Sequence, residues 1–479
     1  MFVFTIKGVL LESINLNHLF PTKTSNFTKD EIFDVAVVGA GVVGCAIFKE
    51  FCEQGAKTVL VEKANDILDG ASKGNSAILH TGFDAPPDTL EHKCVQRGYE
   101  EYMKIKDDYN LPFLNTKALV VAWNDEQLGK LDAILQKGLG NGVKELDLLT
   151  HEQIIKREPN LSLDAKGAIL VHGESLIDPW SAPLAYVKKG INCGGKIAFS
   201  HEVKDGHYNG KYWELQTSQK PINAKVIINA AGLYGDIVDK IKGTQDFKII
   251  PRKGQFVIFD ETAYNLINSI ILPVPTKRTK GVVITKTAFG NILVGPTAED
   301  QESRTDSQTV KETLEDLKNK AFHMLPALKN HKVTATFAGL RPASDEAYYR
   351  VSINDEKNWI TAGGIRSTGL TSSLGLAKHI FELHDTRYEK SPKADEKVTV
   401  PNISEFAPRD NQKEGYGKIV CHCECVTERE IKNACHGELG AGNVGGLKRR
   451  TRAMMGRCQG FNCEAAVTQI CKNEVKNHE

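Results

Sequence analysis

The chain has 479 residues, which at about 100 to 200 residues per domain predicts two to four domains. Its 61 basic and 60 acidic side chains give a net charge of +1, which argues against a protein dedicated to binding nucleic acid or an anionic membrane surface. No stretch of about 20 apolar residues without charges or repeated glycine occurs, so we do not expect an integral membrane protein.

The first 32 residues fit no common targeting signal well. Their apolar stretch, residues 1–11, contains Lys7 and ends at Glu12 without the small residues of a signal-peptide cleavage site. They contain no arginine, which disfavours a mitochondrial presequence, although Ser, Thr and Asn between residues 15 and 28 keep an organellar address open. We therefore expect an N-terminal extension, residues 1–32, on a cytoplasmic protein, with an organelle matrix as the alternative.

A strand, a glycine turn, a helix and a second strand follow in that order. Residues 33–38 are a continuous apolar run of the buried parallel-strand type, residues 42–54 have helical spacing, and residues 58–61 form a second apolar run. This order predicts a βαβ unit, the core of a doubly wound α/β lobe.

The turn of this unit carries the pattern G-x-G-x-x-G, formed by Gly39, Gly41 and Gly44. Such glycines permit a tight turn, the approach of a pyrophosphate to the backbone and close helix packing, while the helix N-terminus faces the phosphates. Glu62 ends the second strand, where a carboxylate can accept hydrogen bonds from ribose hydroxyls. The pattern predicts dinucleotide binding, but it does not distinguish FAD from NAD.

Later segments repeat and extend this architecture. Residues 225–232 and 358–383 each place a short apolar strand before glycine and a helical pattern. Between them, residues 255–259, 281–285 and 291–294 look like strands of an antiparallel sheet in a second lobe. We therefore expect a chain of α/β and α+β class, in which a Rossmann-type lobe is interleaved with an antiparallel-sheet lobe.

A segment rich in proline and charge, residues 390–413, precedes a cysteine-rich tail. Seven of the 11 cysteines follow residue 420, which in a chain without an export signal points to metal binding rather than to disulfides. The tail contains C-x-C and C-x4-C pairs, and four such thiolates can surround a small soft-metal cluster: Cys421, Cys423, Cys458 and Cys463. Structural zinc is the rival, although C-x-C spacing is less typical of it.

Several separated motifs connect the main part of the chain to a known family. They are NSAILHTG at residues 75–82, RKGQ at 252–255, GVVIT at 281–285, LVGPTA at 293–298, FAGLRP at 337–342 and GGIRSTGLT at 363–371. In these motifs, residues 33–383 resemble the FAD-dependent oxidoreductases of the D-amino-acid oxidase and glycerol-3-phosphate dehydrogenase superfamily. The resemblance implies FAD as the cofactor and a Rossmann-type FAD-binding lobe. Ala77 stands where many relatives have glycine.

The resemblance also implies the site residues. Oxidation of an alcohol by flavin needs a general base, for which histidine is suited, and His80 matches the family histidine. Arg341, Lys280 and Ser367 match residues that hold an anionic substrate near the flavin, although Lys277 or Arg278 could replace Lys280. The alternative for Arg341 is a structural pair with a buried carboxylate. The implied cofactor contacts, beyond the four residues above, are Ser72, Asn75, Ser76, Ala231, Gly232, Gly364, Gly369, Leu370 and Thr371.

The tail resembles bacterioferritin-associated-ferredoxin-like [2Fe-2S] domains, which are small and mainly helical. The resemblance implies Cys421, Cys423, Cys458 and Cys463 as ligands and leaves Cys425, Cys435 and Cys471 outside the pattern. Met454 occupies a place where relatives often have glycine. Five basic side chains between residues 448 and 457 lack interleaved aromatic residues, so we expect them to compensate the cluster or to contact an acidic partner, not nucleic acid.

The resemblance implies oxidation of sn-glycerol 3-phosphate to dihydroxyacetone phosphate. The electrons would pass from the flavin to oxygen, a quinone or a redox partner protein, and the [2Fe-2S] cluster is one possible route. The alternatives are an L-2-hydroxyglutarate or related hydroxy-acid dehydrogenase, an amine oxidase of the same fold, or a non-catalytic redox-sensing flavoprotein. The expected domains are an oxidoreductase at residues 33–389, a linker at 390–417 and a [2Fe-2S] domain at 418–475.

Overall fold

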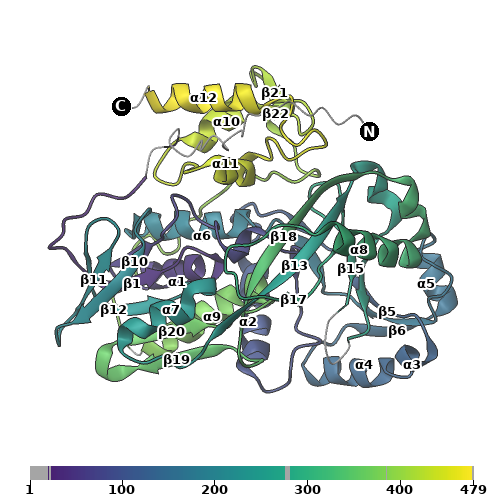
Figure 1. The fold of residues 1–479 in the computed structure, drawn as a ribbon, viewed down its shortest axis with the longest axis horizontal. Coiled ribbons are helices and arrows are strands. Elements are labelled where there is room, and N and C mark those ends of the chain that lie inside the picture. Colours follow the sequence, from purple (N-terminus) through teal and green to yellow (C-terminus); the bar gives the residue numbers. More distant parts are fainter. Residues whose placement is uncertain (1–19, 21–22, 276–280, 385, 477–479) are drawn as a thin grey trace.

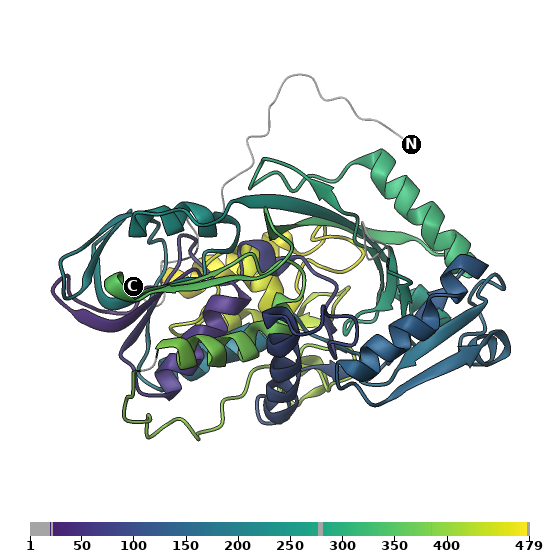
Figure 2. The same ribbon diagram turned by 90° about the horizontal axis from the view of Figure 1, so that it is seen from below.

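Two large sheets lie side by side, and a small third unit rests above them (Figure 1). The structure is a computed structural model that describes residues 20, 23–275, 281–384 and 386–476. The side-by-side arrangement of the two lobes is also visible from below (Figure 2). Among the described residues, no helix is both long and apolar enough to cross a membrane.

The first sheet has eight strands with a parallel centre. Its parallel strands lie in the order β20 (Trp359–Gly363), β12 (Ile222–Asn229), β1 (Ile32–Val38), β2 (Thr58–Val61) and β9 (Lys196–Ala198). Antiparallel strands extend it: β10 (Val203–Tyr208), β11 (Trp213–Thr217) and β19 (Arg350–Asn354). The apolar runs form the buried strands because helices or loops cover both faces of a parallel sheet.

Four helices pack beside this sheet: α1 (Val42–Glu53), α2 (Leu90–Ile105), α6 (Ser181–Asn192) and α9 (Gly369–His384). The aromatic side chains of Phe48, Phe51 and Tyr186 are buried among them. Burial of each such ring contributes about 1.5–3 kcal/mol. A shorter helix, α7 (Gly235–Asp239), follows β12. The expected strand–turn–helix–strand unit is confirmed, with the helix ending at Glu53.

The second sheet has nine strands and is antiparallel except for the pairing of β14 with β5. Its longest pair is β13 (Ile249–Phe259) with β18 (Val333–Ser344). The others are β5 (Ala118–Ala122), β6 (Leu146–Thr150), β7 (Gly167–Val171), β14 (Ile270–Pro273), β15 (Val283–Lys286), β16 (Ile292–Gly295) and β17 (Glu299–Asp300). The helices of this lobe are α3 (Asp125–Leu128), α4 (Leu131–Gly140), α5 (His151–Arg157) and α8 (Lys311–Met324).

A small sheet of β3 (Ile78–Leu79), β8 (Ser175–Ile177) and β4 (Phe113–Leu114) complements the two large sheets. The chain contributes β1 and β2 to the first sheet and then β5 to β7 to the second. It returns to the first sheet with β9 to β12, passes again through the second sheet from β13 to β18, and completes the first sheet with β19 and β20. The expected interleaving of two lobes is therefore confirmed.

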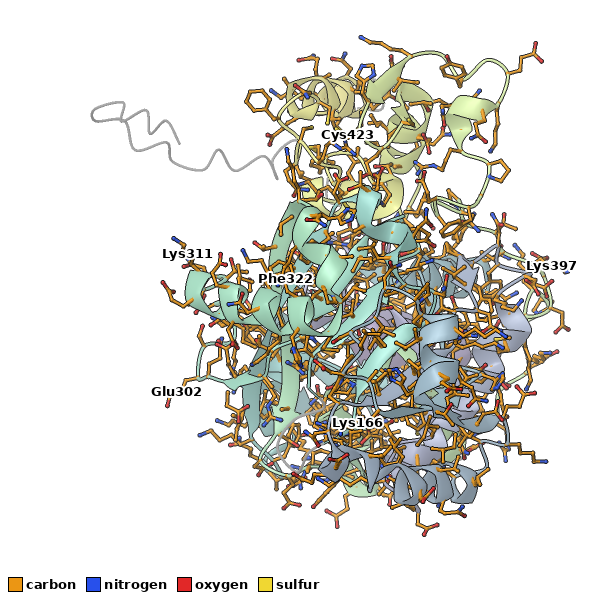
Figure 3. All side chains as sticks on the ribbon, turned by 90° about the vertical axis from the view of Figure 1, so that its right-hand side faces the viewer. Lys166, Glu302, Lys311, Phe322, Lys397 and Cys423 are labelled. Atoms are coloured by element: carbon orange, nitrogen blue, oxygen red, sulfur yellow. The ribbon has the colours of Figure 1, made fainter. Side chains whose placement is uncertain are left out.

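The third unit, which contains Cys423, lies above the lobes (Figure 3). It consists of β21 (Ile419–Cys421), β22 (Val426–Thr427), α10 (Glu428–Cys435), α11 (Val444–Thr451) and α12 (Glu464–Lys476). Helix α10 begins with a capping box, because the Thr427 hydroxyl accepts from the Glu430 N–H and the Glu430 carboxylate accepts from the Thr427 N–H. This unit has an apolar core of its own.

The segment that joins the lobes to the third unit contains one short 3-10 helix, Asp410–Gln412, within residues 386–417. It nevertheless packs on the protein. The Ser391 N–H donates to the Glu53 carbonyl at 3.0 Å, and the Val400 N–H donates to the Tyr109 carbonyl at 3.2 Å. The domain boundaries at residues 389 and 417 stay predictions.

The basic residues of α11 attach the third unit to the first lobe. Arg450 forms a bidentate ion pair with Asp66 at 2.7 and 2.8 Å, and the Arg449 guanidinium donates to the Ile67 carbonyl at 2.9 Å. The side chains of Asp66 and Arg450 are only 1% and 8% exposed. The expected acidic partner of the basic run therefore lies within the same chain.

We expect the substitution Arg450→Met to loosen this attachment. It would leave the Asp66 carboxylate buried without its cation, a loss of about 3–5 kcal/mol for a buried pair. Because 1.4 kcal/mol is a factor of ten, cleavage of residues 386–417 by a protease should accelerate by about 10²-fold or more. The matched control is Lys448→Met on the same helix, since Lys448 forms no ion pair with the described residues. Equal cleavage rates in the two variants would contradict the expectation.

Candidate functional site

The glycine turn between β1 and α1 leaves no room for side chains at two positions. Gly39 has a φ of +108°, and a Cβ atom there would lie 2.6 Å from the Ala230 carbonyl oxygen. A Cβ atom on Gly44 would lie 1.8 Å from the Gly39 carbonyl oxygen. The turn therefore brings α1 close to β1, as a phosphate-binding turn requires. Gly41, the N-cap residue of α1, has no side chain that could cap the helix. The Ser72 hydroxyl instead accepts the Val42 N–H at 3.0 Å.

Glu62 lies beside this turn. Its carboxylate accepts hydrogen bonds from the Ala40 N–H at 2.7 Å and from the Ala64 N–H at 2.9 Å. Burial raises the pKa of this carboxyl, while these two N–H groups counteract the rise. The sequence-predicted acid is thus at the glycine turn, on the carboxyl end of β2.

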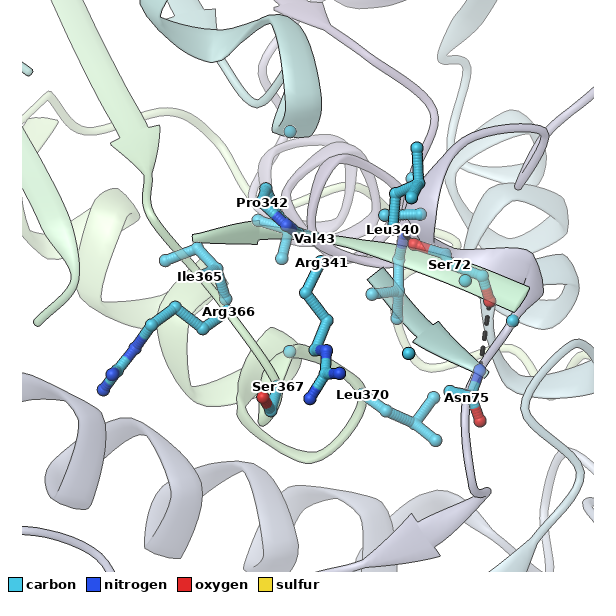
Figure 4. A pocket seen from close by; sticks show the side chains of 18 of the residues that line it. Val43, Ser72, Asn75, Leu340, Arg341, Pro342, Ile365, Arg366, Ser367 and Leu370 are labelled. Carbon is cyan, nitrogen blue, oxygen red and sulfur yellow. Dashed lines mark hydrogen bonds between the residues drawn. The ribbon is translucent and has the colours of Figure 1, made fainter. Parts of the chain in front are cut away.

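A cavity runs from the N-terminus of α1 to the strand β18 (Figure 4). Its lining contains ten of the predicted residues: Gly41, Ser72, Asn75, Ser76, Gly232, Arg341, Gly364, Ser367, Gly369 and Leu370. It does not include Gly39, Gly44, Glu62, His80, Ala231 and Thr371; of these, Gly44, Ala231 and Thr371 adjoin lining residues in sequence. Lys280, Lys277 and Arg278 lie outside the described residues.

Arg341 presents its guanidinium to this cavity close to Ser367 (Figure 4). Its Nη2 donates to the carbonyls of Lys253, at 3.3 Å, and Thr297. No carboxylate among the described residues forms an ion pair with it, so the alternative of a structural pair with a buried acid does not hold there. Burial, followed by repulsion from Arg252, lowers the pKa of Arg341 to about 10. A half-buried cation of this kind favours an anionic ligand.

His80 is joined to a buried carboxylate that the sequence did not predict. The Nδ1 atom of His80 lies 2.9 Å from Oε2 of Glu174. The Glu174 side chain is fully buried, whereas the His80 side chain is 21% exposed. The other oxygen of Glu174 accepts from the Thr81 N–H at 2.7 Å and from the Thr81 hydroxyl at 2.9 Å. With Nδ1 donating to this carboxylate, Nε2 is the nitrogen that can accept a proton.

Thr371 connects His80 to the wall of the cavity. The Thr371 hydroxyl accepts the His80 N–H at 3.0 Å, and Leu370, the preceding residue in α9, lines the cavity. Near it, Ala77 has a φ of +60°, in the left-handed region that favours glycine. In the third unit Met454 has a φ of +65°. Both residues stand where the resemblance places glycine in relatives, and both keep the corresponding backbone conformation.

The four predicted ligand cysteines form two contacting pairs in the third unit. The Cys423 thiol hydrogen bonds to Cys458, and the Cys463 thiol hydrogen bonds to Cys421. The Asn462 and Gly460 N–H groups donate to the Cys458 sulfur and, with the Cys423 thiol, lower its pKa. Such N–H donors stabilise the thiolate form that binds metal.

Paired thiolates fit a two-iron cluster. Each iron of a [2Fe-2S] cluster takes two cysteine sulfurs, so four neighbouring thiolates are the required donor set. Within residues 23–275, 281–384 and 386–476, no group of three or more His, Cys, Asp or Glu side chains is arranged to hold a single metal ion. The four thiols therefore match the donor set of the cluster.

The loop that carries Cys423, which we call the cluster loop, is connected by a series of side-chain contacts to residues 70–76, which we call the flavin-side loop. Glu424, between Cys423 and Cys425, accepts from Arg452 Nε at 3.0 Å. The Arg452 guanidinium lies 4.1 Å from the centre of the Phe289 ring, which stacks on Trp180 at 5.5 Å. The Trp180 indole then donates to the Lys73 carbonyl at 3.2 Å, next to Ser72 and Gly74 of the cavity.

Comparison with protein families identifies both parts of the chain. Residues 34–383 match the FAD dependent oxidoreductase family. The chain belongs to this family. Residues 419–473 match the BFD-like [2Fe-2S] binding domain. The predicted fold class and the two predicted cofactors, FAD and a [2Fe-2S] cluster, are confirmed.

The relatives of this oxidoreductase agree with that assignment. A glycerol 3-phosphate dehydrogenase of Caloramator mitchellensis is 33% identical over 454 residues, which are 93% of this chain and 95% of that protein. A glycerol 3-phosphate oxidase of Mycoplasma pneumoniae is 29% identical over 78% of this chain and 100% of that one. The solved structure of L-alpha-glycerophosphate oxidase from Mycoplasma pneumoniae with FAD bound superposes with a TM-score of 0.73 at 27% identity, covering 78% of this chain and 99% of that one.

The residues of the oxidoreductase fit FAD on structural grounds. The N-terminus of α1, whose N-cap residue is a glycine, faces a cavity whose turn excludes side chains, and this is the surface that a pyrophosphate needs. Gly232, Gly364 and Gly369 line the remainder of the cavity, and Glu62 lies beside the glycine turn without lining it. The individual roles of these residues stay predictions.

Proposed function

We propose that this oxidoreductase converts sn-glycerol 3-phosphate to dihydroxyacetone phosphate, with FAD as the first electron acceptor. The observation that carries the proposal is the half-buried Arg341 guanidinium in a cavity lined by the predicted FAD-binding residues. A phosphate is a suitable ligand for such a planar cation. The similarity to glycerol 3-phosphate dehydrogenases and oxidases over nearly the whole chain supports the same substrate.

In this proposal His80 Nε2 takes the proton of the substrate hydroxyl, while Glu174 holds the imidazole by Nδ1 and stabilises the imidazolium that forms. Bound FAD supplies the acceptor for the hydride of the carbinol carbon. Arg341 and Ser367 hold the phosphate end, and Lys280 contributes a second cation. The substrate thereby loses one proton to the protein and one hydride to the cofactor, which balances oxidation of a secondary alcohol to a ketone.

The [2Fe-2S] domain serves in the proposal as a one-electron carrier between the flavin and an external acceptor. The contact of Glu424 with Arg452 and the ring stack of Phe289 and Trp180 connect the cluster loop to the flavin-side loop. Phe461, in the loop between the ligands Cys458 and Cys463, is 91% exposed and offers a contact for the acceptor, which can be a quinone, oxygen or a redox protein. A cytoplasmic location is part of the same proposal.

An L-2-hydroxyglutarate dehydrogenase is the second candidate. A protein of that name from Indibacter alkaliphilus is 29% identical over 56% of this chain and 68% of that protein. Its substrate would place a carboxylate rather than a phosphate on Arg341. The identity to that protein extends over a smaller part of this chain than that to the glycerol 3-phosphate dehydrogenase, which favours the phosphate substrate.

The test is the visible spectrum of the anaerobic holoprotein with a panel of substrates. We expect the flavin band to bleach when glycerol 3-phosphate is mixed with the protein. L-2-hydroxyglutarate, glycine and L-proline should leave the band unchanged. Bleaching by L-2-hydroxyglutarate alone would assign the second candidate. A flavin that no compound reduces, in protein with full FAD content, would instead indicate a redox-sensing flavoprotein.

A further inference from the structure

Two cysteines outside the ligand set lie against each other in the third unit. Cys435 is the last residue of α10, and Cys471 lies within α12. Their sulfur atoms are 3.3 Å apart. A disulfide requires about 2.05 Å, so the two sulfurs can bond after a movement of little more than 1 Å. Neither residue contributes to the pairs that Cys421, Cys423, Cys458 and Cys463 form.

The two thiols differ in exposure. Cys471 is 1% exposed, whereas Cys435 is only partly buried. The residues on either side of Cys435, Ala434 and His436, line a surface groove that also contains parts of α6 and of the segment before the third unit. Because Cys435 is the more exposed of the two thiols, a small molecule can approach it first, and Cys471 is in position to follow.

Local charges favour Cys435 as the attacking thiol. The hydrogen bond from Cys471 lowers the pKa of Cys435, and the positive charge of Lys23 adds to this effect. Lys23 also donates to the Cys435 carbonyl. By contrast, the hydrogen bond to Cys435 and burial raise the pKa of Cys471. An attacking thiolate beside a protonated resolving thiol is the arrangement of a reactive pair.

We propose that Cys435 and Cys471 form a redox-active pair that closes to a disulfide by exchange with a small disulfide, while the cluster ligands stay in place. The Cys435 thiolate attacks one sulfur of the small disulfide and forms a mixed disulfide. The other sulfur of the small disulfide leaves as a thiolate, which takes up a proton. Cys471 then gives its proton to solvent and attacks the Cys435 sulfur of the mixed disulfide, which expels the second small thiol. Two protein thiols are oxidised, and one small disulfide is reduced to two thiols.

The disulfide would join the helices that follow the two ligand loops. Helix α10 begins after Cys421 and Cys423, and α12 begins after Cys463. Along α12, Val467 and Cys471 follow Cys463 at intervals of four residues, and all three are buried in one core. Closure of the pair would therefore tie the two ligand loops together and slow their separation.

The experiment uses the anaerobically purified holoprotein, incubated in mixtures of oxidised and reduced glutathione. Free thiols are then alkylated, and the peptides are analysed by mass spectrometry. We expect a peptide pair joined through Cys435 and Cys471, the loss of two alkylatable thiols and unchanged cluster bands. The variants Cys435→Ser and Cys471→Ser should not form this peptide pair, whereas Cys425→Ser, at an exposed cysteine, should form it as the natural chain does.

Three results would overturn the proposal. In the first, Cys435 and Cys471 stay alkylatable at every ratio of the glutathione mixture. In the second, the cluster bands disappear in parallel with the loss of the two thiols, which would make the pair part of the cluster site. In the third, oxidised and reduced holoproteins release iron to a chelator at the same rate, which would show that the disulfide does not hold the ligand loops together.

Discussion

The variant His80→Asn should reduce its flavin with glycerol 3-phosphate about 10² to 10⁴ times more slowly than the natural chain, the usual contribution of a general base. Asparagine can occupy the site but cannot accept the hydroxyl proton. Because His80 does not line the cavity with the glycine turn, FAD content should stay unchanged. The measurement is anaerobic stopped-flow absorbance of the flavin band. The matched control is His207→Asn on the exposed strand β10, which should behave as the natural chain does.

Glu174→Gln separates the role of the carboxylate from that of the imidazole. Gln can keep an acceptor for Thr81 and present its NH₂ group to His80 Nδ1, which then accepts, so that Nε2 carries the proton and cannot act as base. We expect a slow flavin reduction here too, with a changed pH dependence and an unchanged FAD content. Natural reduction rates in both His80→Asn and Glu174→Gln would remove this pair from the mechanism.

The variant Cys458→Ser should lose the visible and electron-paramagnetic signals of the [2Fe-2S] cluster and retain its flavin. Cys458 is one half of the pair with Cys423, and N–H groups of its own loop donate to its sulfur. A serine oxygen is a poor replacement for a thiolate on iron. The measurement is the iron content together with both spectra, since the oxidoreductase lobes do not include this loop.

Cys425→Ser is the control for this experiment, since it changes an exposed cysteine two residues after a predicted ligand. It should keep the cluster. Loss of the cluster in Cys425→Ser, with survival in Cys458→Ser, would show that the ligand set is wrong. Substrate-dependent flavin bleaching should persist in Cys458→Ser, while transfer to a one-electron acceptor should fall.

Features encoded by consecutive residues could be predicted from the sequence. The apolar runs of β1 and β2 and the glycines between them specify a turn in which Gly39 and Gly44 admit no side chain. Such a local requirement can be recognised from the order of residues alone. The C-x-C and C-x4-C pairs could be recognised in the same way. Their cross-pairing, Cys421 with Cys463 and Cys423 with Cys458, depends on the tertiary fold and needed the structure.

Contacts between distant segments could not be predicted. Glu174 lies 94 residues after His80, and nothing in the sequence around it distinguishes it from an acid at a strand end. The ion pair of Asp66 with Arg450 spans 384 residues. The sequence left open whether the basic run compensates the cluster or contacts an acidic partner, and only the packing of α11 on the first lobe shows that Arg450 pairs with Asp66. Burial, which gives these pairs their energetic weight, is a property of the fold.

The loop of residues 62–73 belongs to two assemblies at once. At one end Glu62 accepts the N–H of Ala40 in the glycine turn, at the other Ser72 accepts the N–H that begins α1, and between them Asp66 holds the third unit through Arg450. If FAD binding at the glycine turn strengthens the attachment of the third unit through this loop, that attachment strengthens FAD binding by the same factor, because the coupling between two binding events is reciprocal. The shared loop thus gives flavin binding and seating of the iron–sulfur domain a common structural element.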